Sequence, residues 1–200
     1  MTNDFLSAVK SRRTVYTLGK TTTISDTRIE EILKDALTHA PSPFNMQAGR
    51  VVLLLGAKHD AFWGNLKEVL KGIVKDPEAF AKSAERVDGF KAAYGTALFF
   101  EDQSAVKTMQ DQFVLYKDNF PVWSNHSSGM LQYIVWTSLA SEGMGASLQH
   151  YSPLVDEWVY KNAGAKESWK LIAQMPFGKP TAPAGEKIFA PLTERFKIVK

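Results

Sequence analysis

The chain has no cysteine and few histidines. The lack of thiols excludes disulfides, thiolate nucleophiles, cysteine-ligated zinc, iron–sulfur clusters and any thiol-attached cofactor. The four histidines are far apart in the sequence, and no two of them stand three or four positions from each other. A helical histidine pair of the kind that binds zinc is therefore absent, and we expect no metal site.

Long apolar runs are missing as well. No stretch approaches the ~20 apolar residues that a membrane span requires. The N-terminal segment MTNDFLSAVKSRR lacks the apolar core of a signal peptide. We therefore expect a cytoplasmic protein without a membrane partner.

The charges are balanced and interspersed. The 24 Lys and Arg residues against 21 Asp and Glu residues give a net charge of +3. No basic run reaches the length of a nucleic-acid-binding arm, so no nucleic-acid partner is expected. With 200 residues, 44% hydrophobic and 22% charged, the chain has an ordinary globular composition. We expect one domain spanning residues 1–200.

Several common catalytic signatures are also absent. GxGxxG after a strand, GxxxxGK[ST], HExxH and GxSxG do not occur. A resident dinucleotide site of the Rossmann kind and a P-loop are thereby excluded, and zincin or hydrolase chemistry has no sequence support.

Hydrophobic periodicity predicts an α+β chain. Apolar residues at helical spacing predict helices at 3–11, 27–40, 58–75, 77–93, 103–119, 121–142 and 153–164. The second helix is expected to begin either at Ser25 as N-cap or at a capping box of Thr27 with Glu30, and Pro77 is expected in the first turn of the fourth. Short apolar runs predict strands at 50–56, 96–102 and 168–178, and the tail is either a last strand or an extended arm. This order is not a steady βαβ alternation, which disfavours a Rossmann sheet.

The expected helix 121–142 is unusual because its second half, GMLQYIVWTSLA, is apolar nearly all round. Such a helix is buried on several sides. In a chain of this size, part of that burial is expected to come from a partner subunit.

The stretch SRRTVY holds two arginines, Arg12 and Arg13, followed by a hydroxyl, Thr14. Taken alone, the arginines are either a solvated surface or an anion site. Arginine is suited to bidentate phosphate contacts, and a threonine hydroxyl adds a neutral donor. The triplet predicts a phosphate site if other donors converge on it.

Two further segments carry candidate chemistry. In APSPFNMQ, Ser42, Asn45 and Gln47 lie on a short loop, and their side chains suit the edge of a planar heterocycle that presents N–H and C=O groups. In GMGASLQHYSP, two glycines permit a close backbone approach before Gln149 and His150. A plain connecting loop and a helix-ending turn are the structural alternatives. Lys179 and Lys187 belong to a late Pro/Gly-rich segment and are either solvated or part of the anion site.

Taken together, these segments resemble the FMN-dependent nitroreductases. The resemblance rests on a front RR[ST], an APS-x-x-N-x-Q loop followed directly by a strand, and a late G-x-P loop with a basic residue, in that order along nearly the whole chain. SRRTVY, SPFNMQ and SLQHYSP are most similar to the small Frm2-like, fatty-acid-repression-type branch.

The resemblance implies a fold and an activity. The fold is α+β, with a central, mostly antiparallel sheet of about four to five strands surrounded by helices, in an intertwined homodimer with FMN at the interface. The activity is hydride transfer from NADH or NADPH through non-covalent FMN to a nitroaromatic or quinone-like acceptor. No protein side chain is required as a catalytic acid or base, because the chemistry is on the flavin.

The resemblance also assigns cofactor-binding residues. The front segment and the late basic residue would hold the FMN phosphate, ribityl and pyrimidine side, with Lys179 as a less favoured substitute for Lys187. The proline-rich loop would reach the partner's flavin, and a third segment would lie against the ring. The residues are Arg12, Arg13, Thr14, Tyr16, Lys187, Ser42, Pro43, Asn45, Gln47, Leu148, Gln149 and His150.

Tyr16 departs from the family pattern, because many members carry a cation at that position, near flavin N1. His150 or another arginine, such as Arg50, is the expected compensation. The departure keeps a second function open, namely a flavin-binding redox sensor or regulator with little turnover. A non-flavin interaction protein is the third alternative. Phe44, Phe120 and Trp123 are either an acceptor slot or ordinary core.

Overall fold

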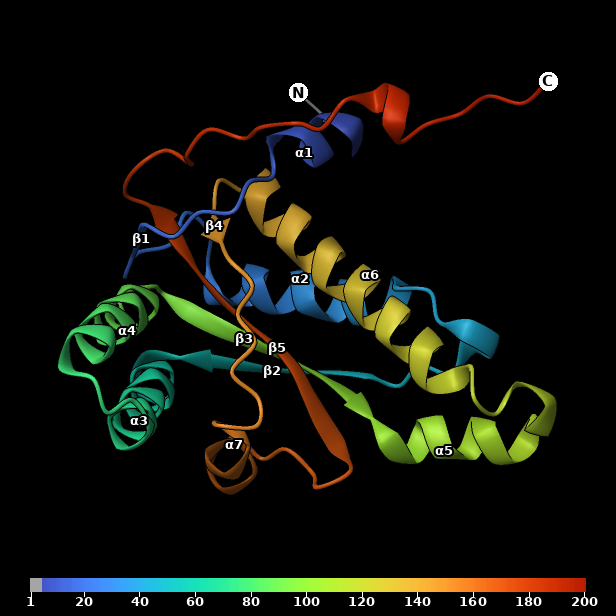
Figure 1. Ribbon diagram of the computed structural model, residues 1–200, viewed down its shortest axis with the longest axis horizontal. Coiled ribbons are helices and arrows are strands. Elements are labelled where there is room, and N and C mark those ends of the chain that lie inside the picture. The colour runs from blue at the N-terminus through green and yellow to red at the C-terminus, as the bar shows by residue number, and fades with distance from the viewer. Residues whose placement is uncertain (1–4) are drawn as a thin grey trace.

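The computed structural model describes residues 5–200 and contains one five-stranded sheet. The strand order is β1-β5-β3-β2, β4 also pairs with β5, and every strand pair is antiparallel (Figure 1). The strands are β1 (Leu18–Gly19), β2 (Gly49–Leu55), β3 (Gly95–Asp102), β4 (Gly145–Ala146) and β5 (Trp169–Pro180). The predicted α+β class with an antiparallel sheet is confirmed.

Seven α-helices surround this sheet in the described part of the chain. They are α1 (Phe5–Ser11), α2 (Asp26–His39), α3 (Gly56–Ile73), α4 (Pro77–Lys91), α5 (Gln103–Gln112), α6 (Phe120–Ser141) and α7 (Asp156–Asn162). Ser25 caps α2 as predicted, because its side chain accepts a hydrogen bond from the backbone N–H of Arg28. Pro77 opens α4, as expected. Within residues 5–200, no helix combines the length and apolar character that crossing a membrane requires.

Strand β3 is the centre of the fold, since all eight of its residues are buried. Ala97 and Phe99 pack into a core formed with α2 and α6, whereas Leu98 and Phe100 pack into a second core with α3, α4 and α7. This alternation follows from the two-residue period of a strand. The sheet is thereby held between two layers of helices (Figure 1).

Some expected boundaries were wrong. Helix α5 ends at Gln112 instead of 119, because Phe113 leaves helical geometry at φ −123° and ψ 66°, and its ring packs 4.6 Å from that of Phe44. Helix α7 covers only Asp156–Asn162. The two-residue strands β1 and β4 were not predicted, because they are too short to show a hydrophobic period. Residues 3 and 4 of the first expected helix lie outside the described residues.

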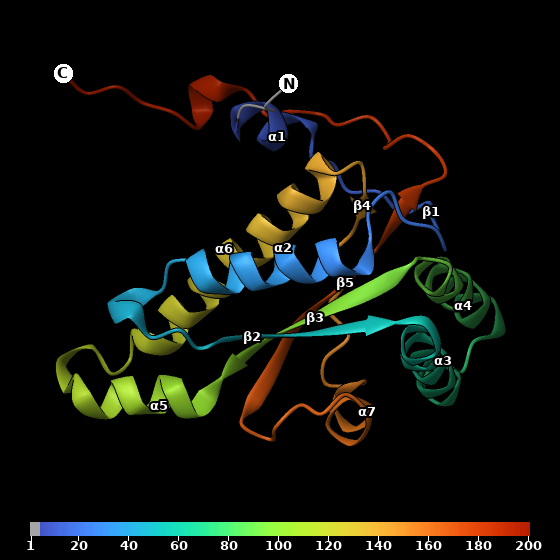
Figure 2. The same ribbon diagram turned by 180° about the vertical axis from the view of Figure 1, so that it is seen from behind.

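Helix α6 and the C-terminal tail expose apolar side chains in the single chain. Val122, Met130 and Tyr133 of α6 are exposed or at the edge of exposure. After β5 the chain runs past α1 as an extended arm with one short 3₁₀ turn, Leu192–Glu194 (Figures 1 and 2). The arm, not a last strand, is thus the observed alternative. Its exposed apolar residues are Ile188, Phe189, Leu192, Phe196, Ile198 and Val199.

Candidate functional site

A pocket of about 390 Å³ brings together two segments that lie some 170 positions apart in the sequence. Its lining residues are Arg12, Arg13, Thr14, Tyr16, Gly185, Glu186 and Lys187. Backbone pairing fixes the first segment, because Thr14 bridges to Ala146 and the N–H of Val15 donates to the carbonyl of Ala146 over 3.0 Å. The Arg13 guanidinium donates to the carbonyl of Gly185 and so holds the late loop against it.

Arg12 has the most informative environment in this pocket. Its guanidinium carbon lies 4.4 Å from the ring centre of Trp136 and 6.0 Å from that of Tyr133, both on α6. Its Nε and Nη1 atoms are buried and find no hydrogen-bond partner among residues 5–200. Leaving buried charged donors unpaired is costly, whereas an anion would satisfy them. The arrangement fits the phosphate group that the sequence predicted here.

The two candidate lysines differ in position. Lys187 lines the pocket, and its ammonium lies 5.0 Å from the ring centre of Phe189. Lys179 is on β5, is exposed, and does not line this pocket; its backbone N–H donates to the carbonyl of Thr21. Lys187 is therefore the better placed of the two for a phosphate.

A wider groove of about 730 Å³ shares Tyr16 with the Arg12 pocket. Gln149 lines it as well, and α4 contributes Lys82, Glu85 and Arg86. Sequence reasoning missed these two cations, because they sit on an ordinary amphipathic helix and carry no motif. They are the basic residues that share a groove with Tyr16, the position where relatives place a cation.

The segment Leu148–His150 is only partly available to a ligand. The backbone N–H and C=O of Gln149 are both paired with Gln174, over 2.8 and 2.9 Å, and its side-chain amide donates to the Ser147 hydroxyl. Leu148 packs against the core beside α2 and α6, and His150 is exposed. A contact from Gln149 to a ligand would have to come from its side chain.

The loop that links α2 to β2 has a rare backbone. Phe44, Asn45 and Gln47 adopt φ values of 52°, 54° and 49°, in the left-handed region that non-glycine residues seldom occupy. Each such residue costs on the order of 1 kcal/mol or more, and clusters of them occur at functional sites. The Ser42 hydroxyl accepts the N–H of Gln47 over 2.9 Å and closes the loop.

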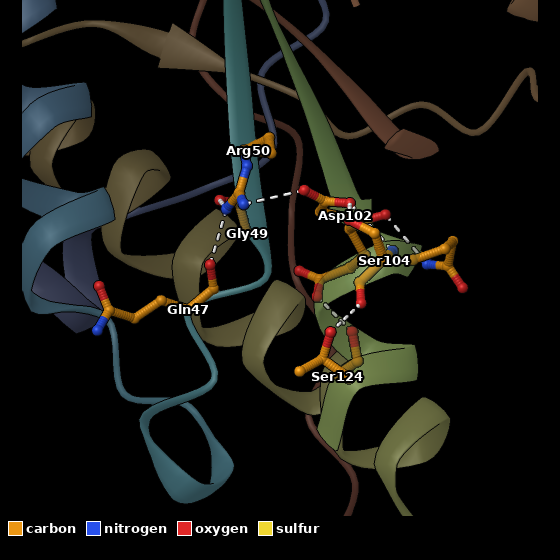
Figure 3. A network of polar contacts seen from close by, with 9 residues as sticks. Gln47, Gly49, Arg50, Asp102, Ser104 and Ser124 are labelled. Carbon is orange, nitrogen blue, oxygen red and sulfur yellow. Dashed lines mark hydrogen bonds and ion pairs between the residues drawn. The ribbon is translucent and has the colours of Figure 1, made fainter. Parts of the chain in front are cut away.

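Arg50 holds this loop in place (Figure 3). Its Nη1 donates to the carbonyls of Gln47 and Gly49 over 2.7 and 2.9 Å, and its Nη2 bonds Asp102 over 3.0 Å. Burial alone would raise the pKa of Asp102, but hydrogen bonds from Ser104 and the charge of Arg50 outweigh it and lower that pKa. Arg50 is thus engaged in building the loop, not in replacing the cation expected near Tyr16.

The aromatic residues considered for an acceptor slot form one cluster. The Phe44 ring lies 5.6 Å from that of Phe120 and 6.3 Å from that of Trp123, measured between centres. Phe120 is fully buried, whereas half of the Phe44 surface is exposed. Phe120 therefore serves the core, and Phe44 is the member that presents a face to the surroundings.

The two groups of predicted residues lie apart within one chain. The loop 42–47 follows the C-terminal end of α2, a helix of 14 residues and thus about 21 Å long. The Arg12 segment lies near the other end of that helix, beside β4 (Figure 2). Ser42 and Gln47 line a different pocket from Arg12 and Lys187. A single chain thus carries two separate parts of the predicted site.

Comparison with known proteins gives the family. A family model described as the nitroreductase family matches residues 9–179. The nitroreductase FRM2 of Saccharomyces cerevisiae is 30% identical over 192 residues, which cover 94% of each chain. The nitroreductase CinD of Lactococcus lactis, solved with chloramphenicol, is 45% identical with a TM-score of 0.90, over 98% of this chain and 100% of CinD.

The fold likeness extends to more distant proteins. A nitroreductase of Desulfitobacterium hafniense with bound FMN is 18% identical, covers 100% of both chains and has a TM-score of 0.72. At this identity the likeness concerns the fold. The family model and the FRM2 alignment together cover most of the sequence. The chain therefore belongs to the nitroreductase family, a family of oxidoreductases.

Proposed function

We propose that this chain is an FMN-dependent oxidoreductase that uses NADH or NADPH to reduce nitroaromatic or quinone-like acceptors. The observation that carries the proposal is Arg12, whose Nε and Nη1 are buried and unpartnered in the described chain, in a pocket that Arg13 and Lys187 also line. When bound, FMN would supply the hydride relay, accepting a hydride from the nicotinamide and passing electrons to the acceptor in alternation.

Each front residue has a defined task in this proposal. Arg12 binds the phosphate through the nitrogens that Trp136 leaves free, and Lys187 adds a second positive charge. Thr14 supplies a neutral donor, and Arg13 keeps the Gly185 loop closed over the pocket. Tyr16 and Gln149 line the adjoining groove, where Arg86 and Lys82 outnumber the one acidic residue, Glu85, and supply the positive charge that position 16 lacks.

We further propose that the working form is a homodimer in which Ser42, Pro43, Asn45 and Gln47 reach the partner's flavin. The separation of the loop from the Arg12 pocket supports this, because one chain does not bring its two parts together. The exposed apolar side chains of α6 and of the C-terminal arm supply surface that a second copy would bury.

The acceptor class is inferred from relatives. CinD has been solved with chloramphenicol and with 4-nitrophenol, and both molecules carry a nitrophenyl group. Phe44, within the strained loop, offers a half-exposed aromatic face, which suits stacking with a flat acceptor. The cytoplasmic location expected from the sequence stays a prediction, to be tested by cell fractionation.

The absorbance spectrum of the purified protein tests the flavin proposal. We expect a yellow protein with a flavin spectrum that bleaches on addition of NADH or NADPH and recovers when a nitroaromatic acceptor is added. A colourless protein that neither binds added FMN nor oxidises NADH would overturn the proposal.

A redox sensor with little turnover is the second candidate, and Tyr16 is the observation that favours it. An exposed phenol at this position supplies no positive charge for a reduced flavin. Steady-state rates separate the two functions. Tight FMN binding with slow NADH oxidation for every acceptor would support a sensor, whereas rapid turnover with any acceptor class supports the enzyme.

A further inference from the structure

Helix α3 carries a buried histidine, His59, of which only 1% of the surface is exposed. Its Nδ1 lies 2.8 Å from the hydroxyl oxygen of Thr96 on β3. Its Nε2 lies 3.1 Å from the carbonyl oxygen of Lys91, the last residue of α4. Helices α3 and α4 lie side by side at the same end of the sheet (Figures 1 and 2). One imidazole ring therefore connects both helices and the central strand.

The hydrogen bonds around His59 can run in only one direction. The indole N–H of Trp63 donates to the Thr96 hydroxyl over 2.9 Å, because an indole nitrogen is a donor only. The Lys91 carbonyl is an acceptor only, so Nε2 of His59 carries the hydrogen. The Thr96 hydroxyl then gives its single hydrogen to Nδ1. The geometry thus selects one neutral tautomer of His59, in which every N–H and O–H of the three side chains is used.

A second proton on His59 would disrupt this network at Thr96. Nδ1 would become a donor, and the hydroxyl oxygen would have to accept from Nδ1 and from Trp63 together. The hydrogen of the hydroxyl would then lack an acceptor, because His59 and Trp63 are its side-chain partners in the described chain. Protonation would therefore place a charge in a buried position and leave a buried donor unpaired, and both are costly.

The charged and titratable groups around His59 do not compensate for this cost. They come from every element packed against the ring: Lys20 after β1, Asp26 on α2, Asp60 on α3, Lys91 on α4 and Tyr94 before β3. Asp60 favours a positive ring, but Lys20 already pairs with it over 2.6 Å. Burial has the largest effect and lowers the pKa of His59, and the bond to the Lys91 carbonyl offsets it only in part.

We propose that His59 is an acid-sensitive lock, which holds α3 and α4 against β3 while its ring is neutral and releases them when the ring is protonated. The lock contains none of the residues assigned to the flavin, so it does not rest on the proposed function. Helix α4 also carries Lys82 and Arg86 of the groove near Tyr16, so acid would loosen one wall of that groove.

Acid should destabilise the folded chain through His59. The pKa of this ring in the folded chain lies below its ordinary value of 6.5. Between these two values the unfolded chain binds a proton that the folded chain does not bind. The free energy of unfolding should therefore decrease as the pH falls below about 6.5.

NMR titration of the imidazole nitrogens in the ¹⁵N-labelled wild-type protein tests the lock without any substitution. At pH 7.5 we expect His59 to carry its hydrogen on Nε2, with Nδ1 unprotonated. On acidification its midpoint should lie below 6.5. A hydrogen on Nδ1 at pH 7.5, or a midpoint at or above 6.5, would overturn the proposal.

Urea unfolding at pH 7.5 and pH 5 measures the effect on stability. His59→Gln keeps a neutral polar side chain that does not titrate, and His39→Gln, on the surface, is the matched control. The unfolding equilibrium constant of the wild type, divided by that of His59→Gln, should rise at least about fivefold from pH 7.5 to pH 5. The ratio to His39→Gln should show no such rise.

The contribution of Glu101 cancels in these ratios, because every chain compared contains it. Thr96 and Glu101 are five positions apart on β3, about 17 Å, so effects at the two sites should add. A ratio of wild type to His59→Gln that stays constant over this pH range would contradict the lock. If His59→Gln does not fold, the NMR titration of the wild type decides the question alone.

Discussion

Arg12 and Arg50 lie in the two separate parts of the proposed site, and they differ in whether their guanidinium nitrogens have hydrogen-bond partners. Arg12 is stacked on Trp136 while two of its buried nitrogens have no partner in the described chain. Arg50 bonds two loop carbonyls and a carboxylate. A guanidinium whose N–H groups have no protein acceptor can donate them to a ligand. A guanidinium whose N–H groups are already paired within the protein stabilises the fold instead.

Replacement of Arg12 should have the largest effect. Arg12→Met keeps an apolar side chain beside Trp136 but removes the guanidinium with its two unpartnered donors, which is worth on the order of 4 kcal/mol, or about a thousandfold in affinity. Titration of the flavin-free protein with FMN, followed by flavin fluorescence, measures this loss. Arg28→Met is the control, because Arg28 forms surface ion pairs with Glu31 and Glu142. Equal FMN affinity of wild type and Arg12→Met would refute the phosphate role.

Glu101 extends the comparison of Arg12 with Arg50. Because Arg50 donates its hydrogen bonds to Gln47, Gly49 and Asp102, the buried carboxyl group of Glu101 has no bonded cation. The pKa of Glu101 is about 7 in the folded chain, above its ordinary value of 4.5. Between these pH values the folded chain retains a proton that the unfolded chain has released. The contribution of Glu101 to the free energy of unfolding should therefore fall by roughly 3 kcal/mol as the pH rises across this interval.

Urea unfolding at a series of pH values tests this slope. Glu101→Gln should reduce the dependence of the free energy of unfolding on pH, since an amide does not titrate. Glu142→Gln, on the surface, should leave this dependence as in the wild type. A fall with rising pH that survives in Glu101→Gln would assign that fall to another group.

Arg50→Lys should have an intermediate effect. A lysine keeps the charge but lacks the planar fork that reaches both carbonyls and Asp102 together. We expect the free energy of unfolding to fall by about 2 kcal/mol in urea titrations. Arg28→Lys, on the surface, should change it by less than about 0.5 kcal/mol. Equal stability of the two variants would mean that the loop does not depend on Arg50.

Gln47→Gly should have the smallest effect on stability, and in the opposite direction. Glycine adopts the φ of 49° without steric cost, although it loses more entropy on folding. The net gain should be about 0.5 kcal/mol, which corresponds to roughly 1–2 °C in melting temperature for a chain of this size. Turnover should decrease, because the side chain proposed to reach the flavin is gone. A gain in stability without loss of turnover would show that the Gln47 side chain is not needed at the flavin.

The sequence allowed the strands β2, β3 and β5 to be predicted from their apolar runs, and the long helices from hydrophobic periods that extend over several turns. It also singled out Arg12, Arg13, Thr14, Tyr16 and Lys187, which the fold brings into one pocket. It did not indicate the architectural role of Arg50, since that role depends on the pairing of β2 with β3. Arg86 and Glu101 were missed for the same reason, because their significance arises from burial and from neighbours distant in the sequence.

Complementation between two defective chains tests the central claim most directly, namely that the Arg12 pocket and the loop 42–47 act together across a dimer. One chain carries Arg12→Met and the other carries Asn45→Ala with Gln47→Ala. Each variant alone should be nearly inactive in NADH oxidation with a nitroaromatic acceptor. Co-expression should restore about a quarter of the wild-type activity, because half of the dimers are mixed and each mixed dimer holds one intact site. Mixed dimers no more active than either parent would contradict the account.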